Sequence, residues 1–171
     1  MTTINTILGD ITKVEGYDAI VNAANTSLLG GGGVDGAIHR AAGPKLLEEC
    51  EKLDGCNVGE AKITSAYNIP CSYIIHTVGP IYYGEGSESK LLHNAYYNSL
   101  DLARKKGIRK IAFPSISTGV YSYPLKEASS IAIQTALDYT KEYPDAFEVI
   151  TWVLFDKHTK SIYDQTLEEL S

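Results

Sequence analysis

Residues 108–155 open with IRKIAF (108–113) and close with FEVITWVLF (147–155), two apolar runs rich in Ile, Val and Phe. Runs of this composition and length predict buried β-strands. Between them, LKEASSIAIQTALDYTKEY (125–143) follows a proline and predicts a helix. Strands interleaved with helices imply an α/β sandwich.

The same alternation extends through the rest of the chain. Shorter strand-like runs occupy 4–8, 18–21, 61–67 and 72–78, and helical patterns occupy 36–42, 44–53, 87–106 and 161–170. We therefore expect one domain over residues 1–171, with a mixed sheet covered by helices on both faces.

Composition excludes several classes of partner. The 171 residues are 44% hydrophobic and 21% charged, with a net charge of −6, which argues against nonspecific binding to duplex nucleic acid or an anionic membrane. No apolar run approaches the roughly 20 residues of a membrane span, and MTTINTILGD (1–10) lacks the basic-then-apolar pattern of a signal peptide, so we expect none. Three cysteines suit a reducing cytoplasm, and the scattered histidines indicate no metal site. We expect a cytoplasmic monomer without a cofactor.

Four polar or glycine-rich segments follow strand-like runs. They are GDIT (9–12), NAAN (22–25), HTVGP (76–80) and PSISTGVY (114–121). Because ligands of such folds bind at the carboxyl ends of the strands, these segments predict a binding site.

The stretch GGGGVDG (30–36) fits neither common nucleotide motif. Residues 22–29 separate its G-x-G-x-x-G match from the preceding strand, and no lysine ends the run as in a phosphate-binding loop. An anion site made of backbone N–H groups at a helix start remains. PSISTGVY offers a second cradle with the hydroxyls of Ser117 and Thr118, and two cradles suit a diphosphate.

Individual side chains near these loops each have a structural and a functional interpretation. Asp35 either caps the following helix or orients a water beside the anion. Asn25 either adopts a left-handed turn or grips a sugar hydroxyl pair. Asp10 either makes an Asx turn or accepts a bond from a base amine. Tyr121 and Phe155 belong to the core or contact a ligand, and His76 is expected in the core.

The motifs GDIT, VNAAN, LLGGGGVDGAIHRAAGP, GEAKIT, YIIHTVGP and PSISTGVY, in this order, resemble the macrodomain family. The similarity is greatest to its MacroD-type branch, including bacterial O-acetyl-ADP-ribose deacetylases, and it runs from about residue 4 to the end. The resemblance implies a three-layer α/β/α sandwich that binds ADP-ribose in a cleft at the strand ends.

Roles for particular residues follow from the resemblance. Asp10 would hold the adenine amino group with a backbone contact from Ile11, Asn25 would fix the distal ribose, and Asp35 would activate water. The first cradle would comprise Gly32, Gly33 and Val34. The second would comprise Ser117, Thr118, Gly119, Val120 and Tyr121. Phe155 would stack on adenine.

The implied reaction is hydrolysis of an ester on the distal ribose, releasing either acetate or an acidic side chain. The resemblance leaves open whether Asp35 or the substrate's α-phosphate activates the water. A non-catalytic ADP-ribose reader is the alternative, and a nicotinamide-dependent oxidoreductase is disfavoured by the position of the glycine run. One departure is Ser122, where the family usually has glycine; if that position requires a positive φ, serine strains the loop.

Overall fold

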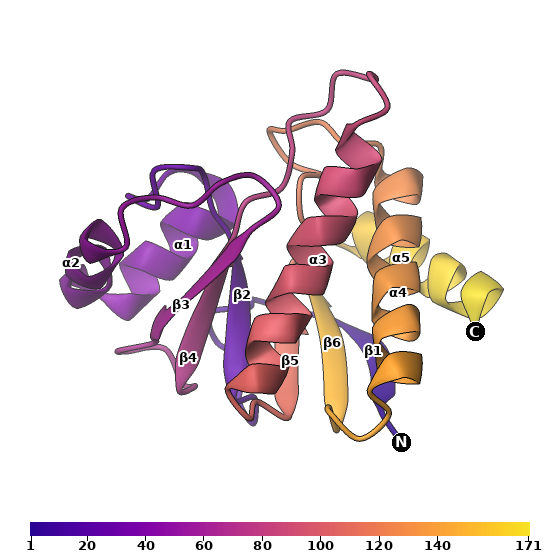
Figure 1. Ribbon diagram of the computed structural model, residues 1–171, viewed down its shortest axis with the longest axis horizontal. Coiled ribbons are helices and arrows are strands. Elements are labelled where there is room, and N and C mark those ends of the chain that lie inside the picture. The colour runs from indigo at the N-terminus through magenta and orange to yellow at the C-terminus, as the bar shows by residue number, and fades with distance from the viewer.

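The computed structural model describes residues 1–171 as one six-stranded sheet with helices on both faces (Figure 1). In chain order the elements are β1 (Thr3–Leu8), β2 (Ala19–Ala23), α1 (Gly33–Ala42), α2 (Pro44–Lys52), β3 (Ala61–Ser65), β4 (Tyr73–Thr77), α3 (Glu88–Lys105), β5 (Lys110–Phe113), α4 (Leu125–Glu142), β6 (Val149–Leu154) and α5 (Lys157–Leu170). The strand order is β1-β6-β5-β2-β4-β3, and only the β3–β4 pair is antiparallel. The expected three-layer sandwich with a mixed sheet is confirmed.

The two faces of the sheet support two separate cores. Ile20 of β2 belongs to the cluster that contains Ile38 of α1 and Leu46 of α2. Its neighbours Ala19 and Val21 belong to the cluster formed with α3, α4 and α5. Because successive strand residues point to opposite faces, strands buried on both sides read as continuous apolar runs. For this reason the continuous apolar runs at 108–113 and 147–155 predict strands correctly.

An aromatic cluster connects the second core to the loop after β5. The Trp152 ring stacks on Phe113 with centroids 5.2 Å apart, and Tyr96 of α3 lies 5.3 Å from Phe113. The Tyr96 hydroxyl accepts a hydrogen bond from the Ile116 backbone N–H at 3.0 Å. The core therefore holds the start of the 114–121 segment directly.

Two helices begin earlier than their apolar patterns indicated. α1 starts at Gly33 rather than residue 36, and α5 starts at Lys157 rather than residue 161. For α5 the cause is Asp156, whose Oδ1 accepts the Thr159 N–H at 2.7 Å and so caps the helix. β6 ends at Leu154, and Phe155 is 81% exposed, so its interpretation as a core residue is wrong. No helix combines the length and hydropathy that a membrane crossing requires.

Candidate functional site

A cavity of about 480 Å³ opens where β2, β5 and β6 reach their carboxyl ends. Four segments line it (23–25, 31–35, 114–121 and 153–156), together with Gly79 and Thr159. The volume lies within the range of small-molecule sites. The sheet thus brings together residues as distant in the chain as Ala23 and Asp156, because its parallel strands end at one edge.

The structure gathers most of the predicted site residues in this lining. They are Asn25, Gly32, Gly33, Val34, Asp35, Ser117, Thr118, Gly119, Val120, Tyr121 and Phe155. Ile11 is instead buried in the core, and Asp10 does not line the cavity. Asp10 Oδ1 accepts bonds from the Thr12 N–H at 2.9 Å and the Thr12 hydroxyl at 2.7 Å, which is the Asx turn that the sequence allowed. Contact of Asp10 and Ile11 with adenine stays a prediction.

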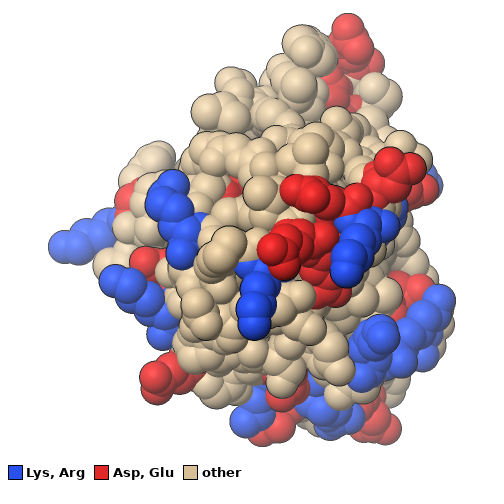
Figure 2. Space-filling model, turned by 90° about the vertical axis from the view of Figure 1, so that its left-hand side faces the viewer, with Lys and Arg blue, Asp and Glu red and all other residues tan.

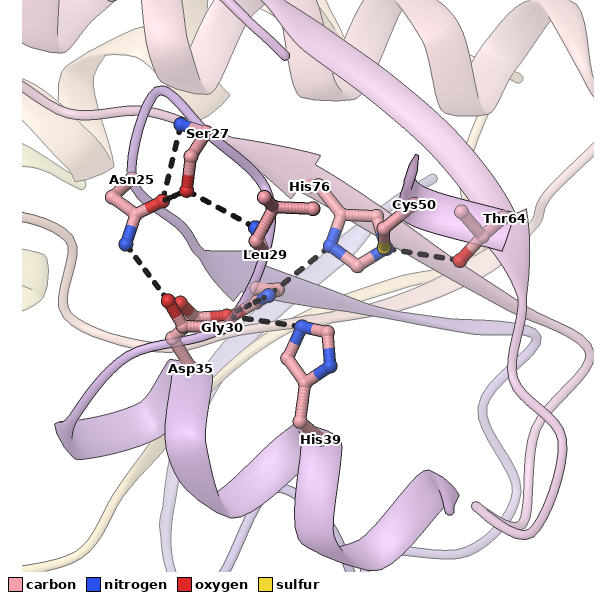
Figure 3. A network of polar contacts seen from close by, with 10 residues as sticks. Asn25, Ser27, Leu29, Gly30, Asp35, His39, Cys50, Thr64 and His76 are labelled. Carbon is pink, nitrogen blue, oxygen red and sulfur yellow. Dashed lines mark hydrogen bonds and ion pairs between the residues drawn. The ribbon is translucent and has the colours of Figure 1, made fainter. Parts of the chain in front are cut away.

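Asp35 is held by the sheet and does not cap its helix. The N-cap of α1 is Gly32, without a side-chain cap bond, so the capping interpretation is wrong. The buried Asp35 carboxylate receives the Asn22 Nδ2–H on Oδ1 at 2.8 Å, and His39 Nε2 lies 3.5 Å from the same oxygen (Figure 3). Oδ2 has no hydrogen-bond partner. A buried acceptor without a partner is unusual in a folded protein and marks Asp35 as a candidate functional residue.

Asn25 closes the loop that precedes the glycine run (Figure 3). Its Oδ1 accepts the Ser27 N–H at 3.2 Å and the Ser27 hydroxyl at 2.7 Å, and its Nδ2 donates to the Gly30 carbonyl at 2.9 Å. Asn25 does not itself have a positive φ; in this loop Leu28, at 60°, and Gly30, at 91°, do. The amide has a second Nδ2–H, which no bond within the protein uses.

Gly31 lies between the two predicted catalytic residues. A Cβ at this position would come within 3.2 Å of both Asn25 Nδ2 and Asp35 Oδ2. A side chain at this position would crowd both the Asn25 amide and the unpaired Asp35 oxygen, so glycine suits the position.

The lining carries no Lys or Arg, and its charged residues are Asp35 and Asp156. An anion in this cavity would depend on backbone N–H groups, above all those at the N-terminus of α1, and on hydroxyls. No group of three or more His, Cys, Asp or Glu residues is arranged to hold a metal ion. On the face shown in Figure 2, blue and red side chains are interspersed without a continuous basic patch.

The loop of residues 114–121 is anchored from below. Ser115 Oγ shares hydrogen bonds with the Tyr163 hydroxyl of α5 and the Thr118 hydroxyl, each at 2.7 Å. Ser117 has a left-handed φ of 68°, and its buried Oγ lacks a partner. Strain and an unpaired hydroxyl on an anchored loop are typical of a ligand-binding position.

Ser122 has a φ of 62°, so the position does require the left-handed backbone. We expect Ser122→Gly to raise the free energy of unfolding by roughly 0.5–1 kcal/mol, because the left-handed region costs an L-residue about 1–2 kcal/mol and glycine's greater unfolded-state entropy offsets part of the gain. Urea denaturation measures the difference. A loss of stability in Ser122→Gly would contradict the assignment of strain to this residue.

His76 is a core residue, as expected. It is fully buried in β4, where Nε2 lies 2.9 Å from Thr64 Oγ1 and Nδ1 lies 3.1 Å from Asn22 Nδ2 (Figure 3). Burial, and secondarily the charge of His39, lowers the pKa of His76 from 6.5 to about 3. The imidazole is therefore neutral at physiological pH.

This shift makes folding stability depend on pH. Below pH 6.5 the unfolded His76 gains a proton that the folded side chain does not bind until about pH 3, so stability is lost as the pH falls through this window. The contribution reaches at most about 1.4 kcal/mol per pH unit. Urea denaturation at several pH values between about 7 and 4 gives the free energy of unfolding as a function of pH. This free energy should depend less steeply on pH in His76→Gln than in the wild type. An equal pH dependence in the two proteins would show that His76 titrates normally.

Some lining residues gave no usable signal in the sequence. Gly79 belongs to the HTVGP segment, in which only His76 has a side chain that suggests a function. Asp156 and Thr159 line the cavity because α5 begins earlier than its apolar pattern indicated. Gly31 was visible within the glycine run, but its place between Asn25 and Asp35 depends on the folded loop.

Comparison with known proteins agrees with this architecture. The sequence profile of the Macro domain matches residues 21–132. The O-acetyl-ADP-ribose deacetylase of Escherichia fergusonii is 49% identical, over 97% of this chain and 96% of that protein. The ADP-ribose glycohydrolase MACROD2 of Xenopus laevis is 50% identical over 94% of this chain, which spans only 39% of that protein.

A solved structure shares the fold as well as the sequence. The Trypanosoma brucei macrodomain in complex with ADP-ribose is 42% identical and superposes with a TM-score of 0.90, covering 95% of this chain and 68% of that one. A profile match over more than half of the chain, a relative aligned along nearly its whole length and a shared fold lead to one conclusion: the chain belongs to the Macro domain family.

Proposed function

We propose that this macrodomain is an ADP-ribose-binding hydrolase that cleaves an ester on the distal ribose. The observation that carries the proposal is Asp35, a buried carboxylate with one oxygen held and the other unpaired, on the wall of a cavity that lacks cationic side chains. A carboxylate beside a diphosphate weakens binding, so its presence favours chemistry over recognition alone. The names of the deacetylase and glycohydrolase relatives support the same class of reaction.

Different lining residues suit the diphosphate, the distal ribose and the adenine of ADP-ribose. Backbone N–H groups of Gly32, Gly33 and Val34, at the positive end of α1, would face the diphosphate. The loop 117–121 would enclose the diphosphate and the distal ribose from the other side. The second Nδ2–H of Asn25 would reach a ribose hydroxyl, and the exposed ring of Phe155 would stack on adenine at the opposite end.

The chemistry assigned to Asp35 is general-base catalysis. Oδ2 would accept a proton from water while the water oxygen forms a bond to the ester carbonyl carbon. The bond between the carbonyl carbon and the ribose oxygen then breaks, and the ribose oxygen leaves with the proton that Oδ2 accepted. The products are a carboxylic acid and ADP-ribose. The substrate's own α-phosphate could serve as the base instead, and turnover by Asp35→Ala separates the two.

The test uses the wild-type protein with two substrates, O-acetyl-ADP-ribose and a protein mono-ADP-ribosylated on acidic side chains. We expect release of acetate from the first substrate or of ADP-ribose from the second, and chromatography measures these products. Tight ADP-ribose binding in calorimetry without turnover of either substrate would show a reader. Binding of NAD as tight as that of ADP-ribose would instead favour a nicotinamide-dependent protein.

A further inference from the structure

A chain of buried polar side chains reaches Asp35 through the sheet. Asn22 lies on β2, His76 on β4 and Thr64 on β3, and their exposed fractions are 0%, 0% and 2%. None of the three lines the cavity. Figure 3 shows the chain of contacts running from Thr64 and His76 toward Asp35. Buried polar groups placed in the middle of a sheet are costly unless their hydrogen bonds are satisfied.

An ionised Asp35 fixes which groups donate and which accept in this network, and it leaves Asn22 Oδ1 without a partner. The neutral imidazole of His76 carries one proton, and its two nitrogens face Asn22 and Thr64. An ionised Asp35 requires a donor, so the amide nitrogen of Asn22, and not its oxygen, must face Oδ1. The same nitrogen faces His76 Nδ1, which therefore accepts.

The proton of His76 consequently lies on Nε2 and is donated to Thr64 Oγ1 at 2.9 Å. The Thr64 hydroxyl in turn donates to the Ser65 carbonyl at 3.0 Å. Both N–H groups of the Asn22 amide are then used, one on His76 and one on Asp35. Each bond fixes the orientation of the next group, as outer hydrogen bonds do around other reactive side chains.

We propose that Asn22 and His76 are positioning residues for Asp35: His76 fixes the Asn22 amide, which holds Oδ1 and leaves Oδ2 for the reacting water. This inference rests on the proposed hydrolase function. Asn22 touches Asp35 alone at the site, and His76 acts through Asn22, so neither contacts the substrate. We call the hydrogen-bonded series Thr64, His76 and Asn22 the positioning relay. This relay would set the rate of the chemical step without contributing to ADP-ribose affinity.

Other groups around Asp35 do not replace this relay. On α1, His39 Nε2 is 3.5 Å from Oδ1, and Arg40 Nη1 lies 3.1 Å from the place of a Cβ on Gly36. On α2, Cys50 Sγ is 4.0 Å from His76 Nε2, and burial raises the pKa of this thiol to about 11, so it stays neutral. Asn22 is the one donor within 3 Å of the carboxylate.

The test is Asn22→Asp, which keeps the side-chain shape and replaces the donor by a second carboxylate. With O-acetyl-ADP-ribose at pH 7, kcat should fall about 10- to 100-fold, because a donor to a charged group is lost. The acid limb of the kcat–pH profile should move up by about one pH unit or more, because adjacent carboxylates resist double ionisation. KM and the ADP-ribose Kd should change by less than about threefold, in line with a side chain outside the cavity.

Nitrogen-15 NMR of His76 gives a readout that does not need turnover. The wild type should show the Nε2-protonated tautomer, and Asn22→Asp should shift it to the Nδ1-protonated form, because the new carboxylate demands a donor. The matched control is Asn98→Asp, which removes the half-buried bond to the Gly59 carbonyl, 2.7 Å long, away from the site. It should leave the kcat–pH profile and the tautomer unchanged.

An unchanged kcat–pH profile in Asn22→Asp would overturn the proposal. Equal losses of kcat and ADP-ribose affinity would also overturn it, because they indicate general distortion of the cavity. If the wild type turns over neither ester, the proposed function fails. The His76 tautomer then tests the positioning relay independently of activity. An Nδ1-protonated His76 in the wild type would then refute it.

Discussion

Asp35→Ala is expected to lower kcat for ester hydrolysis by about 10²- to 10⁴-fold, the range that a positioned general base contributes. ADP-ribose affinity should be retained or rise, because the substitution removes a negative charge beside the diphosphate. Single-turnover assays with O-acetyl-ADP-ribose measure the chemical step, and calorimetry measures the affinity. A loss of kcat without a loss of binding separates a catalytic Asp35 from one that only shapes the loop.

Asp156→Ala provides the matched control, since Asp156 is the other carboxylate of the lining. It caps α5 through the Thr159 N–H, so its loss should lower stability slightly and leave kcat close to that of the wild type. Equal turnover by Asp35→Ala and the wild type would contradict the role of Asp35. It would favour the substrate's α-phosphate as the base.

Among glycine-to-alanine substitutions in residues 30–36, Gly36→Ala should lower the free energy of unfolding most. A Cβ on Gly36 would lie 2.4 Å from the Gly31 carbonyl oxygen, a backbone atom that cannot rotate away. Overpacking of this kind costs about 1–3 kcal/mol. The displaced loop carries Gly31, which lies between Asn25 and Asp35, so we expect both ADP-ribose affinity and kcat to fall with stability.

Gly32→Ala is the matched control for stability within the same run. Nothing lies within 4 Å of a Cβ at Gly32, and its φ of −91° suits any residue. Its free energy of unfolding in urea should stay within about 0.5 kcal/mol of the wild type. Similar destabilisation of Gly32→Ala and Gly36→Ala would show that glycine flexibility, and not the contact with Gly31, controls the loop.

The sequence alone located the strands and helices, apart from the starts of α1 and α5, and most of the segments that line the cavity. The strands at 110–113 and 149–154 are buried on both faces, so their apolar runs are unbroken and easily recognised. The loops after them are conspicuous because small and polar residues follow abruptly. Parallel strands then bring those loops to one edge, so Asn25, Asp35 and the 117–121 segment could be placed together in advance.

Long-range contacts explain what the sequence did not reveal. Local pattern made Asp35 a plausible helix cap, whereas in the structure it bonds to Asn22 on the neighbouring strand. Asp10 shows the opposite outcome, since its bonds to Thr12 are local and the Asx turn was legible. Ser122 lies between these cases: the sequence identified the position, and only the backbone showed its φ of 62°.

Hydrophobic periodicity, glycines and turn residues therefore determined the layers, the edge of the sheet at which the cavity opens and two of the loops that line it, because these depend on neighbours in the chain. Tertiary structure alone decided which oxygen of Asp35 is held and which is free, because Asn22, His76 and Thr64 meet only when β2, β4 and β3 lie side by side. A hydrogen bond requires atoms within about 3 Å, and residues 12 to 54 positions apart reach that distance only through the sheet.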